Sequence, residues 1–194
     1  MDRLARTLHG DELKVAFAFL LTMPGAPFIY YGDEIGLRYV ENLVSVEGGY
    51  NRTGSRSPMQ WNHSVNFGFS NASPEKLYIP TDDKPNSPTV EDQMADPASL
   101  YYEVKKLIAL RRVHSALLSD GDIEFVSDGA DGAPLAYIRS SADEKILVII
   151  NPADKEAVLE VPGIWNESLY TVGGTVKAEN GKRIISPKSA NVLR

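Results

Sequence analysis

The sequence contains no cysteine and only three histidines, His9, His63 and His114, which stand far apart. These features exclude disulfides, thiolate catalysis and cysteine-based metal sites, and they make a zinc site unexpected. No apolar run approaches the roughly 20 residues that span a bilayer. The N-terminal residues also lack the apolar core of a signal peptide. We therefore expect no metal, no membrane partner and a cytoplasmic location.

Strong positive charge is absent as well. The 194 residues carry a net charge of −6, which argues against nucleic acid or an anionic membrane as partner. Two glycine pairs, at 48–49 and 173–174, lack the strand–helix context of phosphate-binding loops and are interpreted as turns. We therefore expect no cofactor, and a neutral substrate suits the charge.

The first part of the chain combines helices with one apolar run and a long irregular stretch. Residues 11–22, DELKVAFAFLLT, have helical apolar spacing and end before Pro24-Gly25. PFIYY at 27–31 predicts a strand that is buried on both faces. Residues 32–97 are rich in glycine, proline and asparagine, and a helix is predicted over 97–113.

The sequence pattern changes after His114. Short segments typical of β-strands alternate there with turn-forming residues such as Asn180-Gly181. The predicted strands are 122–127, 134–140, 145–151, 155–161, 168–172, 182–186 and 190–194. They predict an antiparallel β-sandwich at 115–194, after a first domain at 1–114. A single buried strand cannot form a sheet, so the first domain resembles the end of a β/α architecture.

Two motifs carry a family resemblance. The stretch MPGAPFIYYGDEIGL at 23–37 resembles the last barrel strand of the alpha-amylase family of glycoside hydrolases, and RTGSRSPMQWN at 52–62 with NFGFS at 66–70 resembles its oligo-1,6-glucosidase and trehalose synthase branches. Ser57 and Phe67 depart from the usual threonine and alanine of these motifs. The residues that match the first motif are Gly25, Pro27, Tyr31, Gly32, Asp33 and Glu34.

The resemblance implies an α+β chain made of the C-terminal remnant of a TIM-type (β/α)8 barrel and a C-terminal β-sandwich. A whole barrel needs about 250 residues, and the family's Asn-His-Asp catalytic motif does not occur in this sequence. We therefore expect the chain to hold no catalytic residue and to be inactive alone. The parent protein is expected to be a retaining α-glucosidic hydrolase that acts on α-linked gluco-oligosaccharides.

The adjacent carboxylates Asp33 and Glu34 could either act as catalytic residues or stabilise the structure around the site. A glycosidase needs two carboxylates about 5–10 Å apart across one bond, whereas neighbours on an extended segment point to opposite sides. The favoured interpretation is that the pair supports the site, with Gly25, Pro27, Gly32 and Glu34 forming a structural motif. In the alternative, Asp33 lines the sugar-binding mouth.

Arg56, Gln60 and Trp61 are the main candidates for substrate contact, because guanidinium and amide groups bond hydroxyls and an indole stacks on a pyranose. In the alternative, the Trp61 side chain only packs the loop against the barrel, and Arg56 forms an ion pair with a carboxylate. Tyr31 is interpreted as a core aromatic whose hydroxyl reaches the cleft.

Two other function classes stay open at this point. One is a non-catalytic carbohydrate-binding or accessory module that uses Trp61 or Trp165, although packing is the favoured role of Trp165. The other is a trehalose synthase-type isomerase. The expected partners are an α-gluco-oligosaccharide and either a second copy of the chain or a separate N-terminal barrel portion, because the edges of PFIYY would be unpaired.

Overall fold

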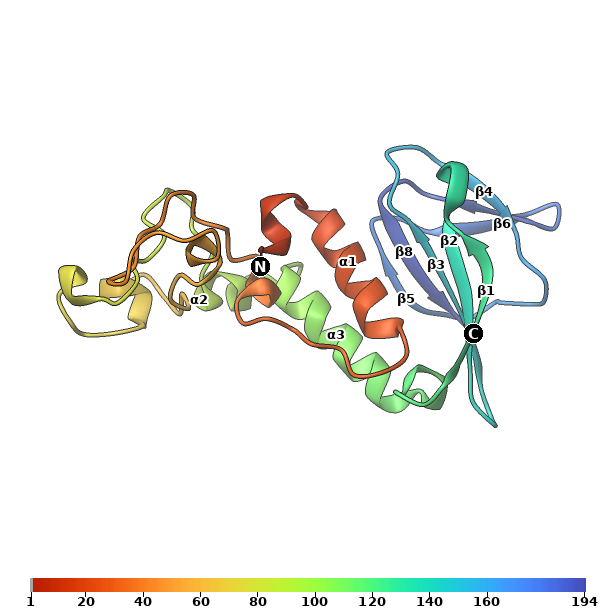
Figure 1. Cartoon of the computed structure of the whole chain (residues 1–194). Helices are drawn as coiled ribbons and strands as arrows, with labels where there is room; N and C mark the ends of the chain where they lie inside the picture. Colours follow the sequence, from red (N-terminus) through yellow and green to blue (C-terminus); the bar gives the residue numbers. More distant parts are fainter. Residues whose placement is uncertain (1) are drawn as a thin grey trace. The chain divides into compact units, whose positions relative to one another are not determined.

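The computed structural model describes residues 2–194 and divides into two compact units (Figure 1). Unit 1 comprises Met1–His9 and Ile29–Glu103, and unit 2 comprises Gly10–Phe28 and Val104–Arg194; Met1 lies outside the described residues. Each unit therefore uses two separate chain segments. The predicted boundary at residue 114 separates a barrel part from a β domain, which is a different division from these two units, and it stays a prediction.

Unit 2 begins with the helix α1, Asp11–Thr22, as the sequence predicts. Asp11 and Glu12 occupy its first turn, where carboxylates interact favourably with the helix dipole. No basic residue lies in its last turn. Instead, two distant arginines bind the carbonyl groups there: Arg139 donates to Thr22, and Arg111 donates to Leu21 at 2.8 Å.

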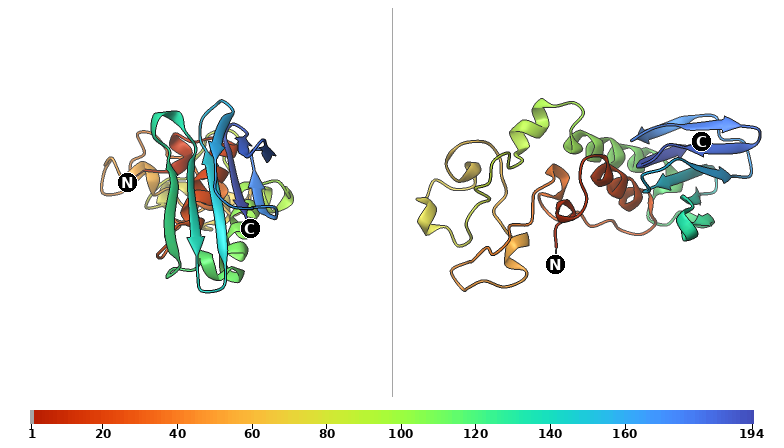
Figure 2. Two further views of the ribbon diagram at one scale, coloured as in Figure 1. Left: turned by 90° about the vertical axis from the view of Figure 1, so that its right-hand side faces the viewer. Right: turned by 90° about the horizontal axis from the view of Figure 1, so that it is seen from above.

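Eight strands within residues 2–194 form two antiparallel sheets (Figures 1 and 2). The five-stranded sheet has the order β1-β2-β3-β8-β5, and the three-stranded sheet has the order β4-β7-β6. Their bounds are Asp122–Asp128 (β1), Leu135–Ser140 (β2), Lys145–Asn151 (β3), Ala157–Glu160 (β4), Ser168–Val172 (β5), Val176–Glu179 (β6), Lys182–Ile185 (β7) and Ser189–Leu193 (β8).

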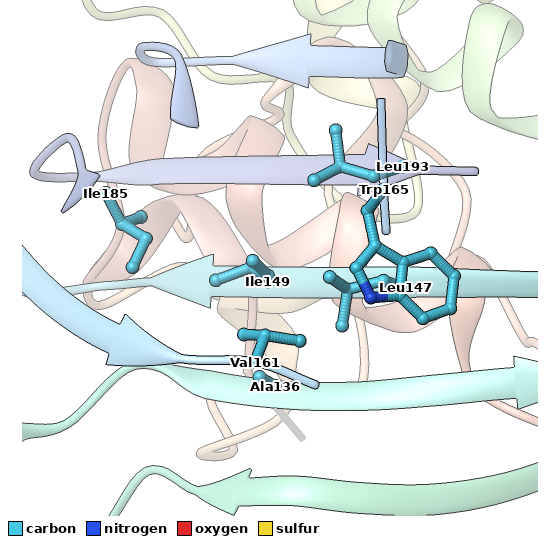
Figure 3. Packing of buried hydrophobic residues seen from close by; sticks show 7 residues of the cluster. All are labelled: Ala136, Leu147, Ile149, Val161, Trp165, Ile185 and Leu193. Atoms are coloured by element: carbon cyan, nitrogen blue, oxygen red, sulfur yellow. The ribbon is translucent and has the colours of Figure 1, made fainter. Parts of the chain in front are cut away.

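The core of unit 2 lies between the two sheets. Its buried side chains come from both sheets and from the segment after β4 (Figure 3). They are Ala136, Leu147, Ile149, Val161, Trp165, Ile185 and Leu193. The indole nitrogen of Trp165 donates to the Pro162 carbonyl at 2.9 Å, so this residue has the packing role favoured by the sequence.

Strand β3 is covered on both faces. Leu147 and Ile149 point into the core between the sheets, and the alternating Ile146 and Val148 therefore lie on the opposite face, where α1 contacts the sheet. All four side chains are fully buried. This double coverage explains why KILVIIN is apolar throughout rather than alternating.

The strand predictions are confirmed with one omission, because β6 was not predicted. Its sequence VKAE carries two charges in four residues, and all but Val176 are exposed. The Asn180-Gly181 turn joins β6 to β7, with φ values of 49° and 79° that fit a tight hairpin.

Unit 1 contains mostly loops and short 3₁₀ turns, with the helix α2, Val90–Ala95, and the start of the helix α3, Leu100–Val113. The prediction of a helix from residue 97 is wrong by three residues. The Asp96 side chain accepts a hydrogen bond from the Ala98 backbone at 2.9 Å, and the Asp96 carbonyl accepts one from Ser99 at 3.0 Å. These bonds form a turn before the helix begins.

The prediction of a buried strand at 27–31 is also wrong for the described residues. Residues 26–30 have no regular secondary structure, and the Phe28 side chain is 88% exposed. A strand needs neighbouring strands for its backbone groups, and no other segment of residues 2–194 pairs with this one. The α+β class and its antiparallel β domain are nevertheless confirmed. No helix within residues 2–194 is long and apolar enough to cross a bilayer.

Candidate functional site

The candidate site is built around a sharp turn at Tyr31, Gly32 and Asp33 in unit 1. Gly32 has a φ of 83°, and a Cβ atom there would lie 2.7 Å from Leu37 Cδ2. The Gly32 carbonyl accepts hydrogen bonds from Ile35 at 3.2 Å and Leu37 at 2.8 Å. Only glycine fits this close approach without strain, so the motif's glycine has a local structural cause.

Arg3 holds the turn from the interior of unit 1. Its side chain is fully buried, donates to the Tyr31 carbonyl and forms an ion pair with Asp33 at 3.0 Å. The guanidinium also lies over the Tyr30 and Tyr31 rings, at 4.4 Å and 4.7 Å from their centres. Burial raises the pKa of Asp33 above its ordinary value, against the opposing effect of Arg3.

A pocket of about 480 Å³ opens beside this turn. Tyr31, Glu34, Arg56 and Trp61 line it together with the apolar or aromatic side chains of Pro58, Met59, Phe69, Tyr78 and Ile79. Glu34 Oε2 is buried and has no hydrogen-bond partner among the described residues. The pocket therefore combines aromatic faces with one guanidinium and one carboxylate group.

Tyr31 connects the turn to the loop that carries the arginine and the tryptophan. Its hydroxyl donates to the Ser57 carbonyl at 2.9 Å. Burial raises the pKa of Tyr31 to about 12, so the hydroxyl stays protonated at neutral pH. Because this proton is already used by Ser57, Tyr31 contributes a fixed ring wall to the pocket.

Backbone bonds hold Trp61 in position. Its N–H donates to the Phe67 carbonyl at 2.8 Å, and its carbonyl accepts from Glu91 at 2.9 Å. Its side chain remains 49% exposed, which leaves an indole surface free for a ligand. Within residues 2–194, this exposure argues against the alternative in which Trp61 only packs the loop against its surroundings.

The structure brings together three of the five predicted substrate-binding residues, namely Tyr31, Arg56 and Trp61. Asp33 does not line the pocket, because its carboxylate is bound by Arg3. Gln60 is fully buried outside the pocket, where its amide nitrogen donates to the Pro88 carbonyl at 2.6 Å. The geometry favours a positioning role for these last two residues, and sugar contact by any of the five stays a prediction.

The predicted structural motif divides between the two units. Gly25 lies in unit 2, where its N–H donates to the Ser119 carbonyl at 2.9 Å and its carbonyl accepts from Arg111 at 2.6 Å. Pro27 also lies in unit 2. Glu34 differs from the expectation, because it lines the pocket in addition to following the turn.

Some pocket residues were missed by sequence reasoning. Phe69 belongs to NFGFS and Tyr78 to KLYIP, and both side chains are about half exposed in the pocket wall. The available signal was an aromatic residue within a long stretch rich in glycine, proline and asparagine. No cluster of three or more histidine, aspartate or glutamate side chains that could hold a metal occurs within residues 2–194.

Comparison with known proteins identifies the family. The family model described as the alpha amylase catalytic domain matches residues 2–121. The chain belongs to the alpha-amylase family. The family resemblance that the two motifs indicated is thereby confirmed.

Two curated relatives in the alpha-amylase family illustrate the similarity. A trehalose synthase of Pimelobacter sp. (strain R48) is 36% identical over 159 residues, covering 77% of this chain and 26% of that protein. A glucan 1,6-alpha-glucosidase of Streptococcus pneumoniae serotype 4 is 35% identical over 210 residues, covering 94% of this chain and 38% of that protein. The chain thus spans well under half the length of these alpha-amylase family relatives.

The fold of this chain is also similar to part of a longer solved structure. The trehalulose synthase MutB from Pseudomonas mesoacidophila MX-45 superposes with a TM-score of 0.77 over 94% of this chain and 38% of that chain. The sequence identity in this superposition is 22%, so the likeness shows the alpha-amylase family fold alone.

Proposed function

We propose that this chain supplies a sugar-binding part of an α-glucosidic hydrolase or transglycosylase that acts on α-linked gluco-oligosaccharides. The observation that carries the proposal is the pocket in which Trp61, Arg56 and Glu34 meet. Sugars have apolar C–H faces and a rim of hydroxyls, so they require both an aromatic surface and hydrogen-bonding groups.

Each pocket group has a distinct role in this proposal. Trp61 stacks on one pyranose face, and Arg56 donates hydrogen bonds to hydroxyl or ring oxygens. The Glu34 carboxylate in the pocket wall accepts hydrogen bonds from the sugar hydroxyls. Tyr31 limits the depth of the pocket, because its hydroxyl is held by Ser57.

The catalytic step is proposed to need carboxylates other than those of this site. A retaining mechanism requires a nucleophile and an acid/base about 5–5.5 Å apart. Asp33 is neutralised by Arg3, which leaves Glu34 as the single carboxylate in the pocket wall. We therefore expect the isolated chain to bind sugar without cleaving it.

Binding is tested by titrating the purified chain with isomaltose and maltose while tryptophan fluorescence is recorded. Trp165 is buried in the β domain, so a response should come from Trp61. Arg56→Met should bind at least about tenfold more weakly in this titration, which corresponds to 1.4 kcal/mol. Trp61→Ala removes the reporter, so its expected weakening of at least about tenfold is measured by isothermal titration calorimetry. The Trp165→Phe variant is the control and should keep the response.

Turnover is tested on p-nitrophenyl α-glucoside at high protein concentration, with circular dichroism to verify folding. No release of nitrophenol is expected. Release that is abolished by Asp33→Asn or Glu34→Gln would overturn the proposed separation of binding from catalysis. Absence of any fluorescence response to both disaccharides would overturn the binding proposal itself.

A second candidate is a trehalose synthase-type isomerase, which is favoured by the 36% identity to the Pimelobacter protein. It uses the same pocket and differs in whether the bound glucosyl unit passes to water or to another sugar hydroxyl. Incubation with maltose in the presence of the separate N-terminal barrel portion distinguishes the two, because isomerisation yields trehalose and hydrolysis yields glucose.

We also propose that the chain associates with a second copy or with such a barrel portion. The exposed Phe28 supports this proposal, together with the backbone at 26–29, which has no hydrogen-bond partner among residues 2–194. Light scattering at rising concentration should show an increase in mass, and a strictly monomeric chain would contradict self-association.

A further inference from the structure

Unit 1 contains a second pocket, of about 690 Å³, which shares no lining residue with the pocket around Trp61. Its walls come from the chain around residues 39–54 and from the segment near residues 2–6. The polar or aromatic residues in these walls include Asp2, Arg6, Tyr39, Glu41, Asn42 and Tyr50. Its volume lies within the range of about 300–1,000 Å³ that is usual for small-molecule sites.

The charges in this second pocket disfavour an anionic ligand. The Arg6 guanidinium is bound by Asp2 at 3.0 Å and by Glu41 at 2.8 Å. It also lies over the Tyr39 ring, 4.0 Å from the ring centre. Both Nη atoms of Arg6 are therefore already paired with carboxylates, so the arginine offers little to a phosphate. The one excess negative charge in the group further disfavours an anion.

Uncharged hydrogen-bonding groups remain available in the same walls. The side-chain amides of Asn42 and Asn51 make no hydrogen bond within the part of the chain that is described. Each amide presents an acceptor and two donors. Glu41 uses Oε1 for Arg6, so Oε2 retains accepting capacity. This combination suits a ligand that carries several hydroxyl groups.

Aromatic surface is present and held in place. The Tyr39 hydroxyl donates to the Asn51 carbonyl at 2.7 Å, and the Tyr50 hydroxyl donates to the Glu47 carbonyl at 3.2 Å. Tyr50 is 49% exposed, and one of its faces is covered by Arg52 at 4.8 Å from the ring centre. A ring that is already held in place and half exposed loses little side-chain entropy when a ligand binds.

We propose that this second pocket is a separate binding site for an uncharged hexose sugar. The Tyr50 ring stacks on the apolar face of the sugar, and Asn42, Asn51 and Glu41 bond its hydroxyls. The salt-bridged Arg6 keeps the two carboxylates in place. The site is independent of the Trp61 pocket, so a chain with both sites binds two sugars.

The test uses the full chain labelled with ¹⁵N and the probe methyl α-D-glucopyranoside at millimolar concentration. The side-chain NH₂ signals of Asn42 and Asn51 report directly on this pocket, and the indole N–H signal of Trp61 reports on the other. We expect both asparagine signals to shift in a saturable manner. Tyr50→Ala should weaken this binding about tenfold, while Tyr50→Phe, which keeps the ring, should stay within about threefold of the original affinity.

The outcomes separate this inference from the proposed function. Saturable shifts at the asparagines in the Trp61→Ala variant would support two independent sites. Shifts confined to the Trp61 indole would overturn the second site and leave the first intact. If the asparagine shifts persist unchanged in Tyr50→Ala, the assigned stacking contact is wrong and the inference fails. A nonsaturating response of all signals together would also overturn it.

Discussion

Replacing Arg139 by methionine removes a buried cation that holds four backbone carbonyl groups in unit 2. Arg139 donates to Thr22 at the end of α1, to Asp122 at 3.1 Å, and to Leu118 and Gly121 at 2.7 Å and 3.1 Å. Its side chain is fully buried. Methionine has a similar length and no donor, so the four carbonyl groups would lose this partner.

The expected loss follows from opposing contributions. A hydrogen bond to a charged group contributes about 1.5–3 kcal/mol net, so four such bonds at the lower value give about 6 kcal/mol. Removing the buried charge relieves a desolvation cost of several kcal/mol, which offsets part of that sum. We expect the free energy of unfolding of unit 2 to fall by about 3 kcal/mol.

The assay is urea unfolding followed by the fluorescence of Trp165, in a Trp61→Phe background that removes the other tryptophan. Arg139→Lys keeps the charge and reaches fewer carbonyl groups, so it should lose about 2 kcal/mol. Arg112→Met on the exposed face of α3 is the matched control and should change stability by less than about 0.5 kcal/mol.

A loss below about 1 kcal/mol for Arg139→Met, with an unchanged dependence on urea, would refute this reasoning. Equal losses for the Arg139 and Arg112 variants would refute it as well. Either result would mean that water or a rearranged backbone satisfies the carbonyl groups as well as the guanidinium does.

Three further predictions concern unit 1. Gly32→Ala should lower its stability by about 1–3 kcal/mol, because the new Cβ meets Leu37; an unchanged melting temperature would contradict this. The protonated His63 ring donates a hydrogen bond to the Asp92 carboxylate, which raises the pKa of His63. The stabilisation from this pair is therefore complete below the ordinary value of 6.5 and is lost as pH rises through the raised pKa. Asp92→Asn should return the pKa of His63 toward 6.5 in an NMR titration, and no change would argue against the pair. Tyr31→Phe should remove one tyrosine that ionises near pH 12 in an ultraviolet titration, whereas an unaltered curve would mean that Tyr31 is not protected by burial.

The elements that were predicted from sequence are those whose pattern reflects local structure. The helix at 11–22 and strands such as 145–151 have the observed bounds, because their apolar spacing matches a single buried surface. PFIYY was predicted wrongly for the converse reason. Its apolar character indicates burial against neighbours that the described residues do not provide, and composition alone cannot supply such neighbours.

The candidate site was predictable only in part. The exposed aromatic and basic side chains of the loop, Trp61 and Arg56, were identified because their chemistry suits sugars. Gln60 has equally suitable chemistry, yet its amide is buried against Pro88. The direction in which a loop side chain points depends on tertiary contacts such as this one. The burial of Arg3 beneath Tyr31 has the same origin and no local signal.

The chain leaves unit 2 after Phe28 and returns to it at Val104, so residues 29–103, the longer segment of unit 1, form an insertion within unit 2. Arg111 binds the Met23 and Gly25 carbonyl groups at 2.7 Å and 2.6 Å, and thereby fastens the two stems of the insertion together. Once the stems are fastened, the entropic cost of a longer insertion rises only logarithmically, by about 0.6 kcal/mol for each doubling. A longer or shorter segment between residues 29 and 103 would therefore change the stability of unit 2 little, because α1 and α3 on either side of it stay joined through Arg111.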